Sequence, residues 1–184
     1  MICVLEIFYG VGLFLRLFVR VTAIVGVEFM RDGIRVAGIA VRTARRGAMG
    51  VLDEVVVEVS GGLIGDMPKK SFERGLTFLS RAQWDAVNAE LGSDLVWHTR
   101  RANVLVEGMG SLAKWIGRRI RIGELVEIEI SGETRPCGLM EYLKPGLEGA
   151  LESECRGGVH GRVIRGGRFR VGDLIAEVAT EEEK

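Results

Sequence analysis

Short runs in which apolar residues occupy every second position recur along most of the chain. Residues 126–131 alternate valine or isoleucine with glutamate or serine, and residues 51–59 place three valines on one face and two glutamates on the other. A period of two is that of a β-strand with one buried face. Further short apolar runs, often bounded by glycines, are residues 36–41, 76–79, 104–106, 120–122, 159–164, 169–171 and 174–178.

One longer segment has the period of a helix instead. Residues 80–91 begin with Ser80 and Gln83 at the capping-box spacing. The same segment carries apolar residues on one face, which are Trp84, Val87 and Leu91. Pro145 is placed to start a second, shorter helix. Many short strands with two or three helices predict a mainly β fold, a barrel or sandwich with a few short peripheral α-helices.

The strand pattern begins near residue 36 and divides the chain into three parts. Residues 1–35 form a leader whose charged residues keep its apolar run below the roughly 20 residues of a membrane span. Three interpretations of the leader remain open: an extra strand or helix packed on the domain, a weak membrane-associating segment, or sequence upstream of a true start at Met30. Residues 36–178 are expected to form one domain, followed by an acidic tail over residues 179–184.

Charge and cysteine content narrow the classes of function. Lys plus Arg equals Asp plus Glu at 25 each, so no net field recruits nucleic acid or an anionic membrane. The 3 cysteines have no CxxC spacing, which argues against a zinc site and against a secreted disulfide framework. We therefore expect a cytoplasmic protein with no nucleic-acid partner and no firm membrane association.

The candidate chemistry centres on Cys137, which follows Arg135 and Pro136 and precedes Gly138. Pro136 fixes its own φ and favours an extended Arg135, so the thiol leaves the predicted strand in a set direction. A neighbouring arginine favours the thiolate form of a cysteine, which is both a nucleophile and a soft metal ligand. The alternative is a buried structural cysteine, because unpaired cysteines are among the most buried residues.

The other thiols, the histidines and the basic loops are weaker candidates. Cys155, His98 and His160 have no partner at a telling spacing, and packing or hydrogen bonding explains each of them. If basic residues of the predicted loops converge, they would form an anion pocket able to hold a phosphate. These residues are Lys69, Lys70, Arg74, Arg100, Arg101 and Arg156, and solvated surface charge is the alternative for each.

Several segments, in this order and spacing, resemble the MOSC domain, which is named after the C-terminal domain of molybdenum cofactor sulfurase. They are Gly62-Leu63-Ile64-Gly65-Asp66, Arg74-Gly75-Leu76-Thr77-Phe78-Leu79, Arg100-Arg101-Ala102-Asn103-Val104, Gly117-Arg118-Arg119-Ile120, Arg135-Pro136-Cys137, Pro145-Gly146-Leu147, Arg156-Gly157-Gly158-Val159 and Val171-Gly172-Asp173. Any one segment is a weak signal, but the ordered set is specific. It covers residues 36–178 and is similar to the short stand-alone bacterial members.

The resemblance implies a closed β-barrel that binds the molybdenum cofactor, a molybdopterin. Cys137 would be the catalytic residue and the metal ligand. The residues implied to contact the cofactor are Lys70, Arg74, Arg101, Asn103 and Arg156. One departure is Ala102, where many members have glutamate.

The same resemblance implies an activity and a partner. Related proteins reduce N-hydroxylated compounds with this cofactor. Because this chain has no flavin, haem or iron–sulfur ligand pattern, the reaction would need an external electron-transfer protein. Pyridoxal phosphate belongs to the full-length sulfurases and would reach this chain only as an inherited family label.

Two alternatives to this activity stay open. In the first, Cys137 receives a persulfide from a cysteine desulfurase and delivers its sulfane sulfur to an acceptor, with no metal bound. In the second, the protein is a non-catalytic barrel whose cysteine is structural.

Overall fold

The structure is a computed structural model, and it describes residues 33–45, 47–68 and 71–179. The expectations for residues 1–32, for Lys69 and Lys70 and for the acidic tail from residue 180 lie outside the described residues. No helix in the described ranges has the length and apolar character needed to cross a membrane.

Short strands dominate the described chain, as the period-two pattern predicts. The strands are β1 (Arg35–Arg42), β2 (Met49–Leu52), β3 (Glu54–Glu58), β4 (Gly62–Leu63), β5 (Leu76–Ser80), β6 (Val104–Glu107), β7 (Arg119–Ile122), β8 (Val126–Glu133), β9 (Val159–Arg165), β10 (Gly167–Arg170) and β11 (Ile175–Glu177). The helices are α1 (Arg81–Glu90), α2 (Gly138–Leu143) and α3 (Leu147–Glu152). Short 3₁₀ turns lie at Phe72–Arg74, Trp97–Arg100, Leu112–Trp115 and Ser153–Cys155.

These strands are divided between two sheets. The larger has the order β11-β7-β8-β9-β5-β6-β1-β2, and the smaller has the order β10-β3-β4. All pairs are antiparallel except β5 with β6, which α1 connects as a crossover helix. The single predicted strand over residues 51–59 is in fact two, because β2 pairs with β1 whereas β3 pairs with β10.

The large sheet stays open, so the expected closed β-barrel is wrong for the described residues. Its outer strands are β11 and β2. One isolated bridge, between Arg35 and Leu174, joins the start of β1 to the residue before β11. Backbone hydrogen bonds of Val36 with Gly172 and Asp173, and of Ile34 with Ile175, accompany this bridge, but β1 and β11 are not paired as strands. The mainly β fold with a few short helices is confirmed.

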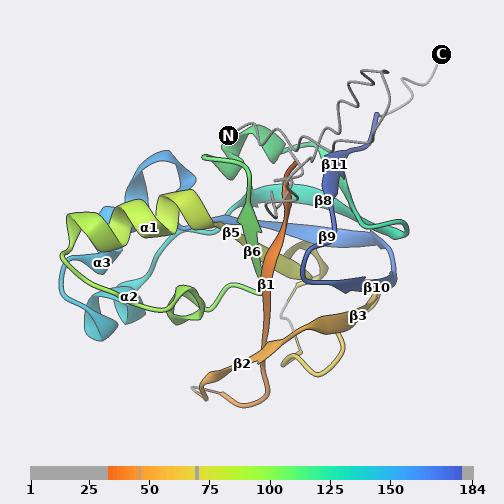
Figure 1. The fold of residues 1–184 in the computed structure, drawn as a ribbon. Helices are drawn as coiled ribbons and strands as arrows, with labels where there is room; N and C mark the ends of the chain where they lie inside the picture. The colour runs from red at the N-terminus through yellow and green to blue at the C-terminus, as the bar shows by residue number, and fades with distance from the viewer. Residues whose placement is uncertain (1–32, 46, 69–70, 180–184) are drawn as a thin grey trace, which may run out of the picture. The chain divides into compact units, whose positions relative to one another are not determined.

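Burial on both faces of β5 and β6 explains why the helices lie where they do. Phe78 and Val104 belong to the core that the two sheets share, whereas Leu79 and Leu105 belong to a second core under the helices. Alternate residues of a strand point to opposite faces, so these two strands need cover on both sides. Figure 1 shows α1, α2 and α3 grouped on one side of β5 and β6, with β3 and β10 on the other.

The helical layer is built largely as the sequence predicts. Ser80 is the N-cap of α1 and accepts a hydrogen bond from the backbone N of Gln83. The helix predicted to start at Pro145 is α3, which begins at Leu147. The unexpected element is α2, which follows Cys137 directly and buries Met140 against the helical core. The thiol therefore lies where the chain passes from the large sheet into the helical layer.

Candidate functional site

Cys137 ends an extended segment that leaves β8. Thr134 N donates to Gly158 O at 2.8 Å, which continues the pairing of β8 with β9. Cys137 itself is extended, with φ −147° and ψ 166°, and holds the N-cap position of α2 without a side-chain capping bond. Its thiol is exposed. Cys137 is therefore not a core-packing residue, and a ligand has access to it.

The Arg100 side chain is hydrogen-bonded to the segment that leads from β8 to Cys137. The side chain is buried, and its Nη2 donates to the carbonyl oxygens of Thr134 at 2.7 Å and Arg135 at 3.4 Å. Burial lowers the pKa of Arg100, Cys137 opposes that shift, and Arg74 adds to it. These interactions place a guanidinium group within electrostatic reach of the thiol. The sequence indicated Arg100 only as one of several basic loop residues.

Arg101 approaches the same thiol from a strained turn. Its backbone is left-handed, with φ 66°, a conformation that costs a residue with a Cβ about 1–2 kcal/mol. The guanidinium donates to Gly47 O at 3.3 Å. Burial lowers the pKa of Arg101, the neighbouring Arg42 lowers it further, and Cys137 raises it. Arg42 is a second member of the site that the sequence did not single out.

The guanidinium groups near Cys137 have donors to spare. The Nε atoms of Arg100 and Arg101 are buried and have no hydrogen-bond partner among the described residues. A buried donor without an acceptor is costly, so an anion that accepted from these atoms would be stabilised. Arg100 and Arg101 interact electrostatically with the exposed thiol, Arg74 interacts with Arg100, and Arg42 interacts with Arg101. Such a group of guanidinium groups would suit an anion bound beside a nucleophile or soft ligand.

Arg156 and Asn103, two other residues predicted to contact the cofactor, form hydrogen bonds within the protein. Arg156 donates through Nη1 to Glu90 at 2.8 Å and to Ala150 O at 3.3 Å, which ties it to α1 and α3. Asn103 is 1% exposed and hydrogen-bonds through both ends of its amide to protein groups. Cys137 interacts electrostatically with Arg100 and Arg101, and Arg74 interacts with Arg100. Contacts of Arg74, Arg101, Arg156 and Asn103 with a cofactor stay predictions.

The other flank of the segment carries Cys155 and His160. Burial raises the pKa of Cys155, and the charge of Glu133 and a hydrogen bond with its side chain raise it further. His160 Nδ1 lies 3.4 Å from Thr134 Oγ1. Burial lowers the pKa of His160, and Arg74 lowers it further, whereas a hydrogen bond with the Glu133 backbone and the charge of Glu73 oppose these shifts.

The lowered pKa of His160 predicts a loss of stability in acid. Below its ordinary value of 6.5 the unfolded imidazole takes up a proton before the folded one does, so unfolding becomes easier as the pH falls. Stability that is present above pH 6.5 is therefore lost as the pH falls below it. Urea unfolding of wild type and His160→Gln between pH 7.5 and 5 checks this: the variant should lose less stability, and equal losses would contradict it.

Comparisons with known proteins agree with the fold and the motifs. The family model of the MOSC domain matches residues 57–176. The crystal structure of the YuaD protein from Bacillus subtilis is 20% identical with a TM-score of 0.67, covering 77% of this chain and 93% of that chain. YiiM from Escherichia coli is 18% identical with a TM-score of 0.62, covering 82% of this chain and 71% of that chain.

A further structure, YiiM from Geobacillus stearothermophilus, is 13% identical with a TM-score of 0.65, covering 79% of this chain and 75% of that chain. At these identities the structural likeness shows the fold alone. A comparison with curated proteins gives no match. The family model spans more than half of the sequence, and the chain therefore belongs to the MOSC domain family.

Proposed function

We propose that this MOSC-domain protein binds the molybdenum cofactor, with Cys137 as a ligand of the metal. The observation that carries the proposal is the exposed thiol beside guanidinium groups whose buried Nε atoms have no acceptor in the described part of the chain. A thiolate is a soft ligand suited to such a metal, and arginine forks suit the phosphate of a pterin. Arg100 and Arg101 would hold this phosphate, with Arg42 and Arg74 adding positive charge.

The local backbone fits such a ligand. Pro136 and the hydrogen bonds from Arg100 fix the direction in which Cys137 leaves β8. The extended conformation at Cys137 directs the chain into α2 rather than back over the thiol. The protein thus offers a preorganised thiol, and ligand binding does not have to order this segment first.

The activity that we propose is the reduction of an N-hydroxylated compound. In this reaction the N–O bond breaks, two electrons and two protons are taken up, and the oxygen leaves as water. When bound, the cofactor would supply the two-electron chemistry, while the electrons would come from an external electron-transfer protein. The chain's own residues would anchor the cofactor, balance its negative charge and leave the thiol side open to substrate.

Sulfur transfer is the second candidate, and the exposure of Cys137 favours it. A cysteine that exchanges sulfur with other proteins must be accessible, and the same arginines would stabilise an anionic persulfide. A cysteine desulfurase would then be the partner. Sulfur released by cyanide in the absence of molybdenum would distinguish this function from the first.

The proposed phosphate site predicts a specific effect of Arg101→Ala. The variant loses the guanidinium beside Cys137, whereas the left-handed strain stays because alanine also has a Cβ. We therefore expect cofactor content to fall about tenfold, equivalent to about 1.4 kcal/mol of binding. Pterin and molybdenum are measured per chain after expression in a host that makes the cofactor. Both should fall together in Arg101→Ala.

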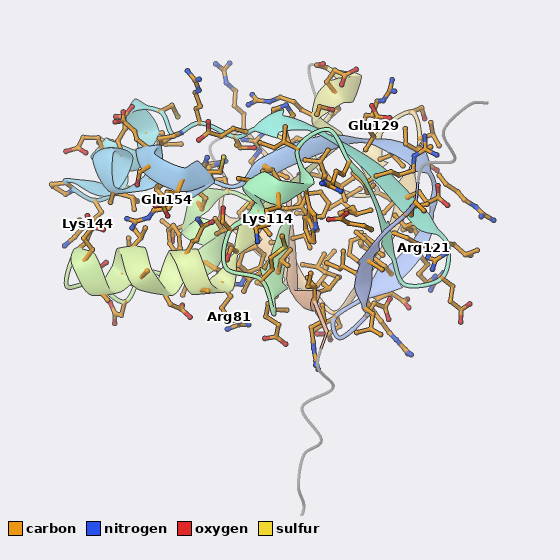
Figure 2. All side chains as sticks on the ribbon, turned by 90° about the horizontal axis from the view of Figure 1, so that it is seen from above. Arg81, Lys114, Arg121, Glu129, Lys144 and Glu154 are labelled. Carbon is orange, nitrogen blue, oxygen red and sulfur yellow. The ribbon has the colours of Figure 1, made fainter. Side chains whose placement is uncertain are left out.

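Arg121→Ala provides the matched control. Arg121 is exposed on β7, and Figure 2 shows it at the opposite end of the molecule from Lys144 in the helical layer. Its removal changes the net charge by the same amount but should leave the cofactor content at the wild-type level. Equal losses in the two variants would argue against a phosphate site at Arg101.

A further inference from the structure

A buried polar network lies behind the arginines of the site. Asn103 Oδ1 accepts from Thr77 Oγ1 at 2.9 Å and from Thr77 N at 3.2 Å. Its Nδ2 donates to Ala40 O at 3.2 Å and to Asp66 Oδ2 at 3.0 Å. One amide therefore ties β5, β1 and the turn after β4 together, two residues from Arg101.

Asp66 is the outer member of this network. Its Oδ1 accepts from the backbone N of Arg42 at 2.7 Å, while its Oδ2 accepts from Asn103. The next residue, Met67, donates its backbone N to Arg42 O at 2.7 Å. The carboxylate thus joins the end of β1, which carries Arg42, to the segment that carries Arg101.

Both arginines need such a restraint. Arg101 keeps an unfavourable left-handed backbone, and its charge lies close enough to that of Arg42 for each to destabilise the other. Hydrogen bonds from Asn103 N to Thr77 O and Thr77 Oγ1, both at 3.0 Å, hold the chain just after the strained residue. A carboxylate that accepts from both segments can fix their relative position, and its hydrogen bonds are strengthened by charge.

We propose that Asp66 is a positioning residue of the anion site: together with Asn103 it holds Arg101 near Cys137 and Arg42 next to Arg101. This role rests on the proposed function, because it matters only if those arginines bind an anion next to the thiol. Asp66 acts through the arginines and does not touch the ligand. A carboxylate at this position therefore increases the attraction of the site for anions, although its own charge is negative.

Positioning of the arginines by Asp66 would strengthen anion binding, whereas the negative charge of Asp66 would weaken it. Because these effects have opposite signs, an experiment can distinguish them. The experiment uses the full chain with Cys3→Ser and Cys155→Ser, so that Cys137 is the only thiol. Rates are measured with a dianionic reagent, 5,5′-dithiobis(2-nitrobenzoate), and a neutral one, 4,4′-dithiodipyridine. In each reaction the Cys137 thiolate attacks the disulfide, a new S–S bond forms, and one half of the reagent leaves as its thiolate.

The measured quantity is the ratio of the anionic rate to the neutral rate. Asp66→Asn keeps the shape but removes the charge and one acceptor, so a positioning role predicts a ratio lower by about three- to tenfold. Loss of a negative charge without displacement of the arginines would raise the ratio instead. A general loss of stability would change both rates alike, and thermal unfolding of each variant monitors it.

A second variant, Asp66→Glu, keeps the proposal testable if Asp66→Asn fails to fold. Asp66→Glu keeps the charge but moves the carboxylate by one methylene, so a positioning role again predicts a lower ratio, whereas a role of charge alone predicts no change. Asp173→Asn is the matched control, because Asp173 also accepts a backbone hydrogen bond, from Arg170 N at 2.9 Å, and pairs with an arginine. Asp173 O accepts from Val36 near the start of β1, at the other end of that strand from Arg42.

The outcomes separate this inference from the proposed function. A lower ratio in both Asp66 variants, with Asp173→Asn unchanged and Arg101→Ala lowered, supports the positioning role. An unchanged or raised ratio in the Asp66 variants, with Arg101→Ala lowered, overturns the positioning role and leaves the anion site standing. An unchanged ratio in Arg101→Ala overturns both.

Discussion

Gly157→Ala is expected to destabilise the protein by about 3 kcal/mol and to disturb the site. A Cβ at this buried position would collide with the carbonyl oxygen of Thr134, and it would lie 3.1 Å from Arg100 Nη2 and 3.4 Å from Pro136 Cδ. The first of these atoms belongs to backbone fixed by the pairing of β8 with β9, so it cannot move without breaking hydrogen bonds. Only glycine lets the two segments approach so closely.

Gly149→Ala is the control for this prediction. Gly149 lies within α3, and a Cβ there would meet nothing within 4 Å. Alanine is the better helix former by about 1 kcal/mol, so this variant should be as stable as wild type or slightly more stable. Urea unfolding compares the free energies of unfolding of the three proteins. A Gly157→Ala variant with wild-type stability would mean that the Thr134–Pro136 backbone adapts easily.

The collision also links fold and function. Arg100 donates to the carbonyls of Thr134 and Arg135, and the same Thr134 carbonyl oxygen is the one that a Cβ on Gly157 would strike. A shift of this backbone would therefore displace both the thiol and a guanidinium group of the proposed phosphate site. In a Gly157→Ala protein that still folds, we expect weaker cofactor binding for that reason.

Local patterns predicted the strands well because each buries one face at a fixed period. Residues 126–131 are a clear example and became β8, and the helical period of residues 80–91 likewise predicted α1. The closed barrel was wrong because closure depends on pairing between distant strands, which local patterns do not reveal, and β11 pairs with β7 but not with β1 or β2. The sequence does not predict α2, because its 6 residues span fewer than two turns and are too few to show a helical period.

The sequence suggested the central residues of the proposed site but not the residues around them. Cys137 stood out through its neighbours Arg135 and Pro136, and family motifs added Arg74 and Arg101. Arg42 could not be found this way, because it reaches Arg101 only through the fold, from the end of β1. The tandem Arg100–Arg101 was the one available signal for Arg100, whose burial under the Thr134–Cys137 segment no sequence pattern reveals.

The largest functional effect is expected for Cys137→Ser. A serine hydroxyl does not ionise at neutral pH and is a harder ligand than a thiolate, so the metal would lose its protein ligand. Because the Cys137 side chain is exposed and makes no capping hydrogen bond, the fold should not change. Cys155→Ser is the matched control, since this second thiol lies on the Glu133 flank of the segment.

The most direct measurement of the central claim is the molybdenum content per chain of wild type, Cys137→Ser and Cys155→Ser, all made in a host that synthesises the cofactor. We expect near-stoichiometric molybdenum in wild type and in Cys155→Ser, and almost none in Cys137→Ser. Molybdenum retained in Cys137→Ser would contradict the assignment of the ligand. Absence of molybdenum from all three proteins would contradict cofactor binding itself. Cyanide-releasable sulfur on wild type and Cys155→Ser, but not on Cys137→Ser, would then assign Cys137 to sulfur transfer.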